Sequence, residues 1–190
     1  ALTPLIPTEV AQTLFLYTEN ILCRADQLLD ERDRGERSAF KDKEITAIRN
    51  ACFYLLGVLT GMRCSELSAI EIDAGRTEIK NGITFHWIAS VEYKTGKGRV
   101  EYLMPALGHR ILAVMERWST PYREKVTNQI ATMERKSGER TTRELQWMST
   151  SRSNVRRLFM GYGKSGIVPV SGSAWNSILL RMARDAGTEW

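Results

Sequence analysis

The chain has 190 residues, of which 43% are hydrophobic and 26% charged; this suffices for one domain with a hydrophobic core and excludes a disordered tail. Three scattered cysteines are too few for a disulfide framework or a paired zinc site, so we expect a reducing, intracellular setting and no metal. The longest apolar run, residues 51–60, is shorter than the roughly 20 residues that cross a bilayer, and the N-terminus lacks a charged-then-apolar signal. We therefore expect a cytoplasmic protein with no membrane partner.

The positive charge is concentrated in one part of the chain. The net charge is +5, yet residues 110–164 hold 12 lysines and arginines against 5 acidic residues, whereas the rest of the chain holds 15 against 17. Such a segment is typical either of a surface that follows a phosphate backbone or of a solvated helix face, and both interpretations stay open.

The N-terminal third is predicted to be helical. After a short extended lead, a helix is expected to start with Thr8 as its N-cap and to run to about Leu29. The almost wholly charged residues 30–43 then indicate an exposed loop.

Two further helices are predicted before the first strand. Apolar residues recur every three or four positions over residues 44–59, which predicts a helix with one buried face that ends near Gly61. The same period resumes over residues 63–71, so Arg63 is expected in the first turn of a short helix.

After Gly75 the period changes from helical to alternating. The dipeptide Asn81-Gly82 separates two alternating stretches and is typical of a tight hairpin. We expect a small three-stranded antiparallel sheet, closed by Pro105. Its strands are predicted from residues 77–80, from residues 83–87 with a further piece ending near Tyr93, and from residues 100–104.

The rest of the chain is predicted to form helices around this sheet. They are expected at residues 107–118, residues 122–133 and, more weakly, residues 155–159. The last helix is expected to be capped by Ser173 and to end at Gly187. The expected fold class is therefore α+β, mainly helical. Because the chain stops at Trp190 directly after a helix, we expect it to be a piece of a longer protein.

One motif combines a guanidinium with a carboxylate at a predicted helix start. It is the run Thr60-Gly61-Met62-Arg63-Cys64-Ser65-Glu66-Leu67. An arginine beside unpaired backbone N–H groups is a good receptor for a phosphate, and Glu66 is placed to hold it. A surface ion pair is the simpler interpretation of this spacing taken alone.

A second motif lies at the predicted turn between two strands. It is the run Tyr93-Lys94-Thr95-Gly96-Lys97-Gly98-Arg99. Such a turn can bring a lysine to a phosphate or to a leaving oxygen, although solvated turns are also commonly rich in lysine and glycine.

The order of these elements resembles the catalytic domain of the tyrosine recombinase (phage integrase) family. The family's first catalytic block resembles Thr-Gly-x-Arg-x-x-Glu-Leu, which residues 60–67 match at every defining position, and Lys94-Thr95-Gly96 is similar to its second element. The resemblance covers most of residues 2–187, although residues 119–150 are longer than expected. It implies that residues 1–190 form part of a catalytic domain, without the N-terminal DNA-binding domain and without the C-terminal catalytic segment.

The family's remaining catalytic groups would follow the helix that ends at Gly187. They are a His-x-x-Arg block, a later histidine or tryptophan, and a tyrosine nucleophile, and none is present. His86 is interpreted as structural, and His109 as a residue at a helix start. The nucleophile is expected beyond Trp190, because every tyrosine of the chain precedes its place. These tyrosines are Tyr17, Tyr54, Tyr93, Tyr102, Tyr122 and Tyr162.

The resemblance implies a metal-independent transesterification without cofactors. A tyrosine attacks a DNA phosphodiester to form a 3′-phosphotyrosyl bond, which a 5′-hydroxyl of another strand reverses. Arg63 would hold the non-bridging oxygens, Lys94 would protonate the departing 5′-oxygen as general acid, and Glu66 would orient Arg63. Lys97 is the rival general acid, and Lys97 and Arg99 are otherwise expected to bind DNA.

The expected partner is double-stranded DNA, bound weakly and with strong salt dependence. The parent enzyme is expected to act as a homotetramer on paired DNA sites, and the 190-residue chain to be monomeric and inactive. Three alternatives stay open: a type IB topoisomerase-like enzyme, a non-catalytic DNA-binding relative, and a basic module that binds protein or RNA. The presence of Arg63, Glu66 and Lys94 argues against a non-catalytic relative.

Overall fold

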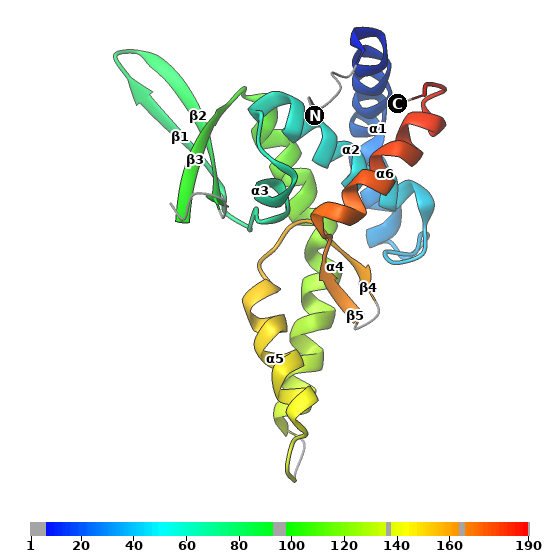
Figure 1. The fold of residues 1–190 in the computed structure, drawn as a ribbon, viewed down its shortest axis with the longest axis vertical. Coiled ribbons are helices and arrows are strands. Elements are labelled where there is room, and N and C mark those ends of the chain that lie inside the picture. Colours follow the sequence, from blue (N-terminus) through cyan, green and yellow to red (C-terminus); the bar gives the residue numbers. More distant parts are fainter. Residues whose placement is uncertain (1–6, 93–97, 136–137, 164–165, 190) are drawn as a thin grey trace, which may run out of the picture.

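A computed structural model of the protein describes residues 7–92, 98–135, 138–163 and 166–189. It confirms an α+β fold with a three-stranded antiparallel sheet. The sheet lies to one side of a group of helices, and the outer part of α4 extends away from them together with α5 (Figure 1). In chain order the elements are α1 (Thr8–Asp33), α2 (Lys43–Thr60), α3 (Cys64–Ser68), β1 (Gly75–Lys80), β2 (Ile83–Glu92), β3 (Gly98–Met104), α4 (Leu107–Arg135), α5 (Thr142–Asn154), β4 (Met160–Gly163), β5 (Gly166–Pro169) and α6 (Gly172–Asp185).

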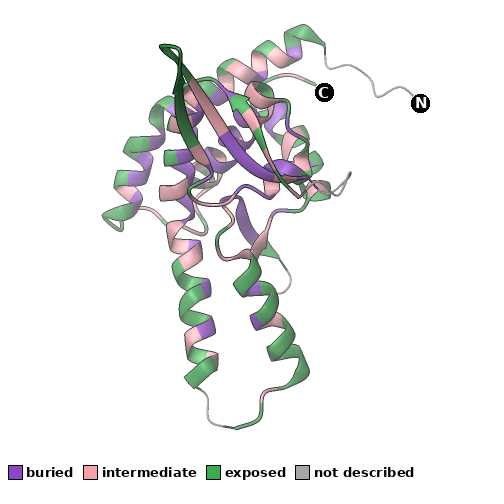
Figure 2. Ribbon diagram, turned by 90° about the vertical axis from the view of Figure 1, so that its left-hand side faces the viewer, coloured by how far each residue is buried: buried purple, intermediate pink, exposed green. Residues whose placement is uncertain are grey.

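The core is built around α2, which packs against α1, α4 and α6. Its apolar residues reach almost every side of the helix, and Ile48 and Leu56 are completely buried. Phe53 stacks on Trp175 of α6, with ring centroids 3.4 Å apart. Figure 2 shows that the buried residues gather mainly in the body of the molecule, while the outer turns of α4 and α5 are mostly exposed. Because α2 is held by three other helices, the turn that follows it has a fixed position.

Both ends of α2 are set by local signals. Asp42 caps its first turn by accepting hydrogen bonds from the backbone N–H groups of Glu44 and Ile45. Gly61 ends the helix in the left-handed conformation, with φ +67°, which glycine adopts without strain. The predicted end of this helix near Gly61 is thus confirmed.

The predicted bounds of α1 need two corrections. Pro7 holds the N-cap position and no side chain caps this end, so the prediction of Thr8 as the cap is wrong. The helix also continues to Asp33, beyond the expected end at Leu29. The added turn is stabilised because Arg32 is buried against α4.

The hairpin predicted at Asn81-Gly82 is confirmed. Both residues have positive φ, 53° and 77°, as a tight hairpin turn requires, and Lys80 pairs with Ile83 across it. Residues 83–92 form one continuous strand, β2, where the sequence predicted two pieces. The tip of this hairpin extends beyond the helices, and Ile79 and Ile83 are 73% and 59% exposed there.

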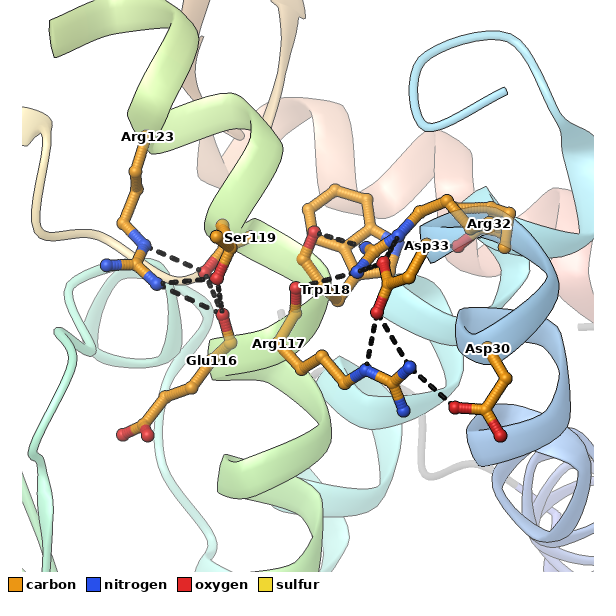
Figure 3. A network of polar contacts seen from close by, with 10 residues as sticks. Asp30, Arg32, Asp33, Glu116, Arg117, Trp118, Ser119 and Arg123 are labelled. Atoms are coloured by element: carbon orange, nitrogen blue, oxygen red, sulfur yellow. Dashed lines mark hydrogen bonds and ion pairs between the residues drawn. The ribbon is translucent and has the colours of Figure 1, made fainter. Parts of the chain in front are cut away.

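The prediction of two helices over residues 107–118 and 122–133 is wrong, because α4 runs through Pro121 as one helix. Proline lacks the N–H that would bond the carbonyl of Arg117. Arg32 of α1 supplies the missing donor: its Nη2 donates to the Arg117 carbonyl and its Nη1 to the Trp118 carbonyl, each at 3.1 Å (Figure 3). A buried arginine from α1, which is distant in the sequence, therefore supplies the hydrogen bonds that allow α4 to continue through Pro121.

The chain after α4 also differs from prediction. The weak helix expected over residues 155–159 is absent from the described structure; α5 ends at Asn154, and Leu158 and Phe159 are buried in an irregular bend before β4. The hairpin of β4 and β5 was not predicted, because its strands are only four residues long and contain glycine.

The last helix, α6, is confirmed with one correction. Its N-cap is Ser171, whose hydroxyl accepts a hydrogen bond from the Ala174 N–H, and Ser173 lies within the helix. Gly187 follows its end with φ +79°, as expected.

We predict that Arg32→Met lowers the free energy of unfolding by about 2–4 kcal/mol, because two hydrogen bonds from a charged donor to buried carbonyls are lost. In a Pro121→Ala background the loss is expected to be smaller by about 1 kcal/mol, because alanine restores a backbone N–H that can bond the Arg117 carbonyl. Urea denaturation of the four proteins measures both losses. An equal loss in the two backgrounds would contradict the role given to Arg32.

Candidate functional site

Arg63 lies at the junction of α2, α3 and the sheet. It is the N-cap residue of α3, with φ −72° and ψ 155°, so the prediction that it sits inside the first turn is wrong. The helix itself is shorter than predicted and spans only Cys64–Ser68. A helix of five residues sums few peptide dipoles. The guanidinium of Arg63, rather than the end of the helix, is therefore the feature that can bind an anion.

Glu66 is the buried partner of this arginine, with a side chain only 3% exposed. Its Oε2 accepts the backbone N–H of Arg63 at 2.7 Å, and its Oε1 accepts Nη1 of Arg63 at 2.8 Å. The hydroxyl of Tyr102 in β3 contributes to lowering the pKa of this carboxylate. Because Glu66 is buried and both of its carboxylate oxygens accept hydrogen bonds from Arg63, the pair is not an ordinary surface ion pair.

The surroundings of Glu66 shift its pKa. Burial alone raises the pKa of a carboxyl group, but the hydrogen bonds from the Arg63 backbone, the Arg63 guanidinium and the Tyr102 hydroxyl outweigh that effect. The pKa of Glu66 therefore lies below its ordinary value, and the group is ionised at neutral pH. Burial, together with the bond to Glu66, raises the pKa of Tyr102.

The end of β2 completes the site. Ser90 donates to the backbone carbonyl of Glu66 at 2.5 Å, and Glu92 accepts Nη1 of Arg63 at 3.2 Å. Both residues face α3 because alternate residues of a strand point to the same side of the sheet. Sequence analysis missed Ser90, Glu92 and Tyr102 as site residues. The alternation along β2 and β3 indicates which residues share a face, but not what covers that face.

Arg63 keeps a part of its guanidinium available. Hydrogen bonds to Glu66 and Glu92 raise its pKa, so it carries a full positive charge. Its side chain is 54% exposed, and within the described part of the chain only Nη1 has hydrogen-bond partners. The edge formed by Nε and Nη2 matches the two-point geometry in which arginine binds phosphate. The arrangement is therefore that of an oriented anion receptor.

The other predicted site residues divide into two groups. Lys94 and Lys97 lie outside the described residues, although Glu92 and Gly98, which flank their segment, pair across β2 and β3. Arg99 pairs with Val91, so its side chain lies on the face of the sheet opposite Ser90 and Glu92. There it lines a cavity of about 270 Å³ together with Arg156. The structure therefore does not bring Arg99 to the face that holds Arg63.

The two histidines meet each other away from Arg63. His86 in β2 and His109 in the first turn of α4 both lie within hydrogen-bond distance of the Thr77 hydroxyl, at 3.3 and 3.1 Å. Their rings stand edge to face with centroids 4.9 Å apart. This position of His109 agrees with its prediction as a residue at a helix start.

The basic segment is partly neutralised by acidic residues from elsewhere in the chain. Arg117 binds Asp30 and Asp33 of α1 (Figure 3), and Arg156 lies within 3.5 Å of both Glu71 and Asp73. Arg110 and Arg157 likewise pair with acidic side chains that precede the segment. These pairs reduce the charge that the segment offers to a phosphate backbone.

Comparisons with family models, with curated proteins and with solved structures find no match to this chain. Across the described ranges no helix combines the length and apolar character needed to cross a membrane. In those same ranges no three or more histidine, cysteine or acidic side chains gather as metal ligands. Interpretation of the site therefore depends on its geometry and on the resemblance carried by residues 60–67 and 94–96.

We predict that Glu66→Gln removes a pH-dependent part of the stability. Because the pKa of Glu66 is lowered in the folded protein, the unfolded chain binds the proton at higher pH, and this carboxylate stabilises the fold above its ordinary pKa of 4.5. That stabilisation is lost as the pH falls below 4.5 through the folded pKa. The difference in unfolding free energy between wild type and variant should thus be constant near neutral pH and shrink in acid.

Urea denaturation over a pH series measures this difference. Glu124→Gln, which removes an exposed carboxylate from α4, is the matched control. A difference between wild type and Glu66→Gln that stays constant into acid would contradict the prediction.

Proposed function

We propose that the chain is part of a tyrosine-type site-specific DNA recombinase, an enzyme that cuts and rejoins DNA through a 3′-phosphotyrosyl intermediate. The observation that carries this proposal is the oriented guanidinium of Arg63. It is half-exposed, has a free edge of the right shape for a phosphate, and is fixed by a buried carboxylate three residues later. Arg63 also lies against the strand end that leads to Lys94-Thr95-Gly96 in the sequence.

In this proposal each residue has one task in the transesterification. The tyrosine hydroxyl gives up its proton as its oxygen attacks phosphorus, the bond to the 5′-oxygen breaks, and that oxygen takes up a proton. Arg63 binds the non-bridging oxygens and stabilises the charge that builds on the five-coordinate phosphorus. Lys94 is the proposed general acid, with Lys97 as its rival, and Glu66 holds Arg63. No cofactor takes part in this chemistry.

The proposal includes the parts of the enzyme that the 190 residues lack. The nucleophilic tyrosine and a His-x-x-Arg block belong to a segment after Trp190, and a separate DNA-binding domain precedes the catalytic domain. The partner is double-stranded DNA in the cytoplasm, and the parent acts as a homotetramer on paired sites. The geometry of Arg63 serves a type IB topoisomerase equally well, so relaxation of supercoiled DNA without exchange of partners distinguishes that enzyme.

We predict that the parent coding sequence continues past Trp190 with a His-x-x-Arg block followed by a tyrosine. In the parent protein Arg63→Ala should lower the rate of strand cleavage by about 100-fold or more, because a donor aimed at the developing charge is lost. Arg63→Lys should recover only a small part of the rate, since lysine supplies the charge without the two-point geometry. Formation of covalent protein–DNA adducts measures the rate. A coding sequence without these groups would refute the enzyme.

We predict that the 190-residue chain binds a short DNA duplex weakly, with an affinity that falls steeply as salt rises, and forms no covalent adduct. Arg63→Ala should weaken binding by about tenfold or more, the loss expected for one charged contact to phosphate. Arg24→Ala, which removes an exposed arginine of α1, is the control and should change binding less. Fluorescence anisotropy measures both affinities. Salt-independent binding, or tighter binding to RNA than to DNA, would favour the basic interaction module instead.

A further inference from the structure

Glu92 is a nearly buried carboxylate with one hydrogen-bond partner in the described chain. Its side chain is 11% exposed, and the group that it binds is Nη1 of Arg63. Taking a carboxylate out of water costs free energy unless it is paired. A single bond at 3.2 Å is weak compensation compared with the two bonds, at 2.7 and 2.8 Å, that Glu66 accepts from Arg63. The burial of Glu92 is therefore better explained by its contact with Arg63 than by a contribution to the stability of β2.

The two carboxylates hold the same nitrogen of the guanidinium. Oε1 of Glu66 and Oε1 of Glu92 both accept from Nη1, at 2.8 and 3.2 Å, and they come from different elements, α3 and β2. A guanidinium is planar and presents five N–H groups, so two acceptors at one end determine how the plane is turned. The opposite edge presents two parallel N–H groups, one from Nε and one from Nη2, and neither nitrogen has an acceptor in the described residues.

The backbone fixes the distance between these groups. The Ser90 hydroxyl joins β2 to the carbonyl of Glu66 two residues before Glu92, and Glu92 itself pairs with Gly98 of β3. Arg63 is anchored independently, because its own N–H is bound by Glu66. The backbone of Glu92 is therefore held in place, and its carboxylate contacts the long Arg63 side chain from that fixed point.

We propose that Glu92 is a positioning residue for Arg63. Together with Glu66 it holds Nη1, so that the edge of Nε and Nη2 is turned toward a phosphate of bound DNA. Glu92 does not itself contact the phosphate. The inference rests on the proposed function, because a phosphate is the ligand that this edge would take.

Simple electrostatics makes the opposite prediction for Glu92. The cluster holds two carboxylates and one guanidinium, so removing Glu92 takes away a negative charge and should strengthen the binding of DNA. If Glu92 positions Arg63, its loss frees the side chain, which must then lose rotamer entropy to bind, and DNA binding should weaken. The sign of the change therefore separates the two explanations.

The test measures binding of a short DNA duplex to the 190-residue chain at one low salt concentration. Glu92→Ala is expected to weaken binding by about threefold to tenfold, the loss of roughly one hydrogen bond's positioning free energy. Glu92→Gln is expected to stay within about twofold of wild type, because its amide oxygen still accepts from Nη1. In an Arg63→Ala background, Glu92→Ala should cause no weakening. Glu124→Ala removes an exposed acid and serves as the control for charge.

The outcomes separate this inference from the proposed function. If Arg63→Ala weakens binding and Glu92→Ala strengthens it as Glu124→Ala does, only the positioning role is overturned. Equal weakening by Glu92→Ala with and without Arg63 assigns Glu92 a structural role and also overturns it. If the chain does not bind the duplex, or Arg63→Ala has no effect, the proposed function and this inference both fail. Urea denaturation checks folding, and Glu92→Leu replaces Glu92→Ala if the latter does not fold.

Discussion

The ionised carboxylate of Glu66 is the constraint on which the candidate site depends. A carboxylate removed from water must be supplied with donors, and here they come from the backbone and side chain of Arg63. These bonds give Arg63 a defined orientation, and the hydrogen bond from the Ser90 hydroxyl to the Glu66 carbonyl ties α3 to β2. The need to satisfy one buried charge thus places a half-exposed arginine at the junction of the helices and the sheet, which is the property that a phosphate receptor requires.

Local signals in the sequence were sufficient where one short segment determines the conformation. Gly61 ends α2 and Asn81-Gly82 forms the hairpin because their positive φ values suit those residues. They were insufficient where a distant residue changes the outcome. A proline such as Pro121 ordinarily interrupts a helix, and nothing near it in the sequence indicates that Arg32 supplies donors to the carbonyls of the preceding turn, so that α4 continues. The same limit applies to Glu92, because alternation along β2 predicts its face but not its contact with Arg63.

The distribution of charge shows the same contrast between sequence and space. Counted along the chain, residues 110–164 form a strongly basic segment. In the fold, Arg117 lies against two aspartates of α1, and Arg156 lies beside acids of the loop after α3. Charges that are distant in sequence neutralise each other at the surface. The local geometry of Arg63 is therefore a better guide to phosphate binding than the net charge of a segment.

The length of β2 has a mechanical consequence. At about 3.3 Å per residue, its ten residues reach roughly 30 Å from the exposed tip at Ile83 to Glu92 beneath Arg63. One strand therefore forms part of the solvent-exposed end of the hairpin and also carries Glu92, which binds Arg63. A macromolecule that binds the hairpin tip, where Ile79 and Ile83 are exposed, would contact the same strand that carries Glu92. A twist of the tip would then apply torque to the backbone of β2 at Glu92.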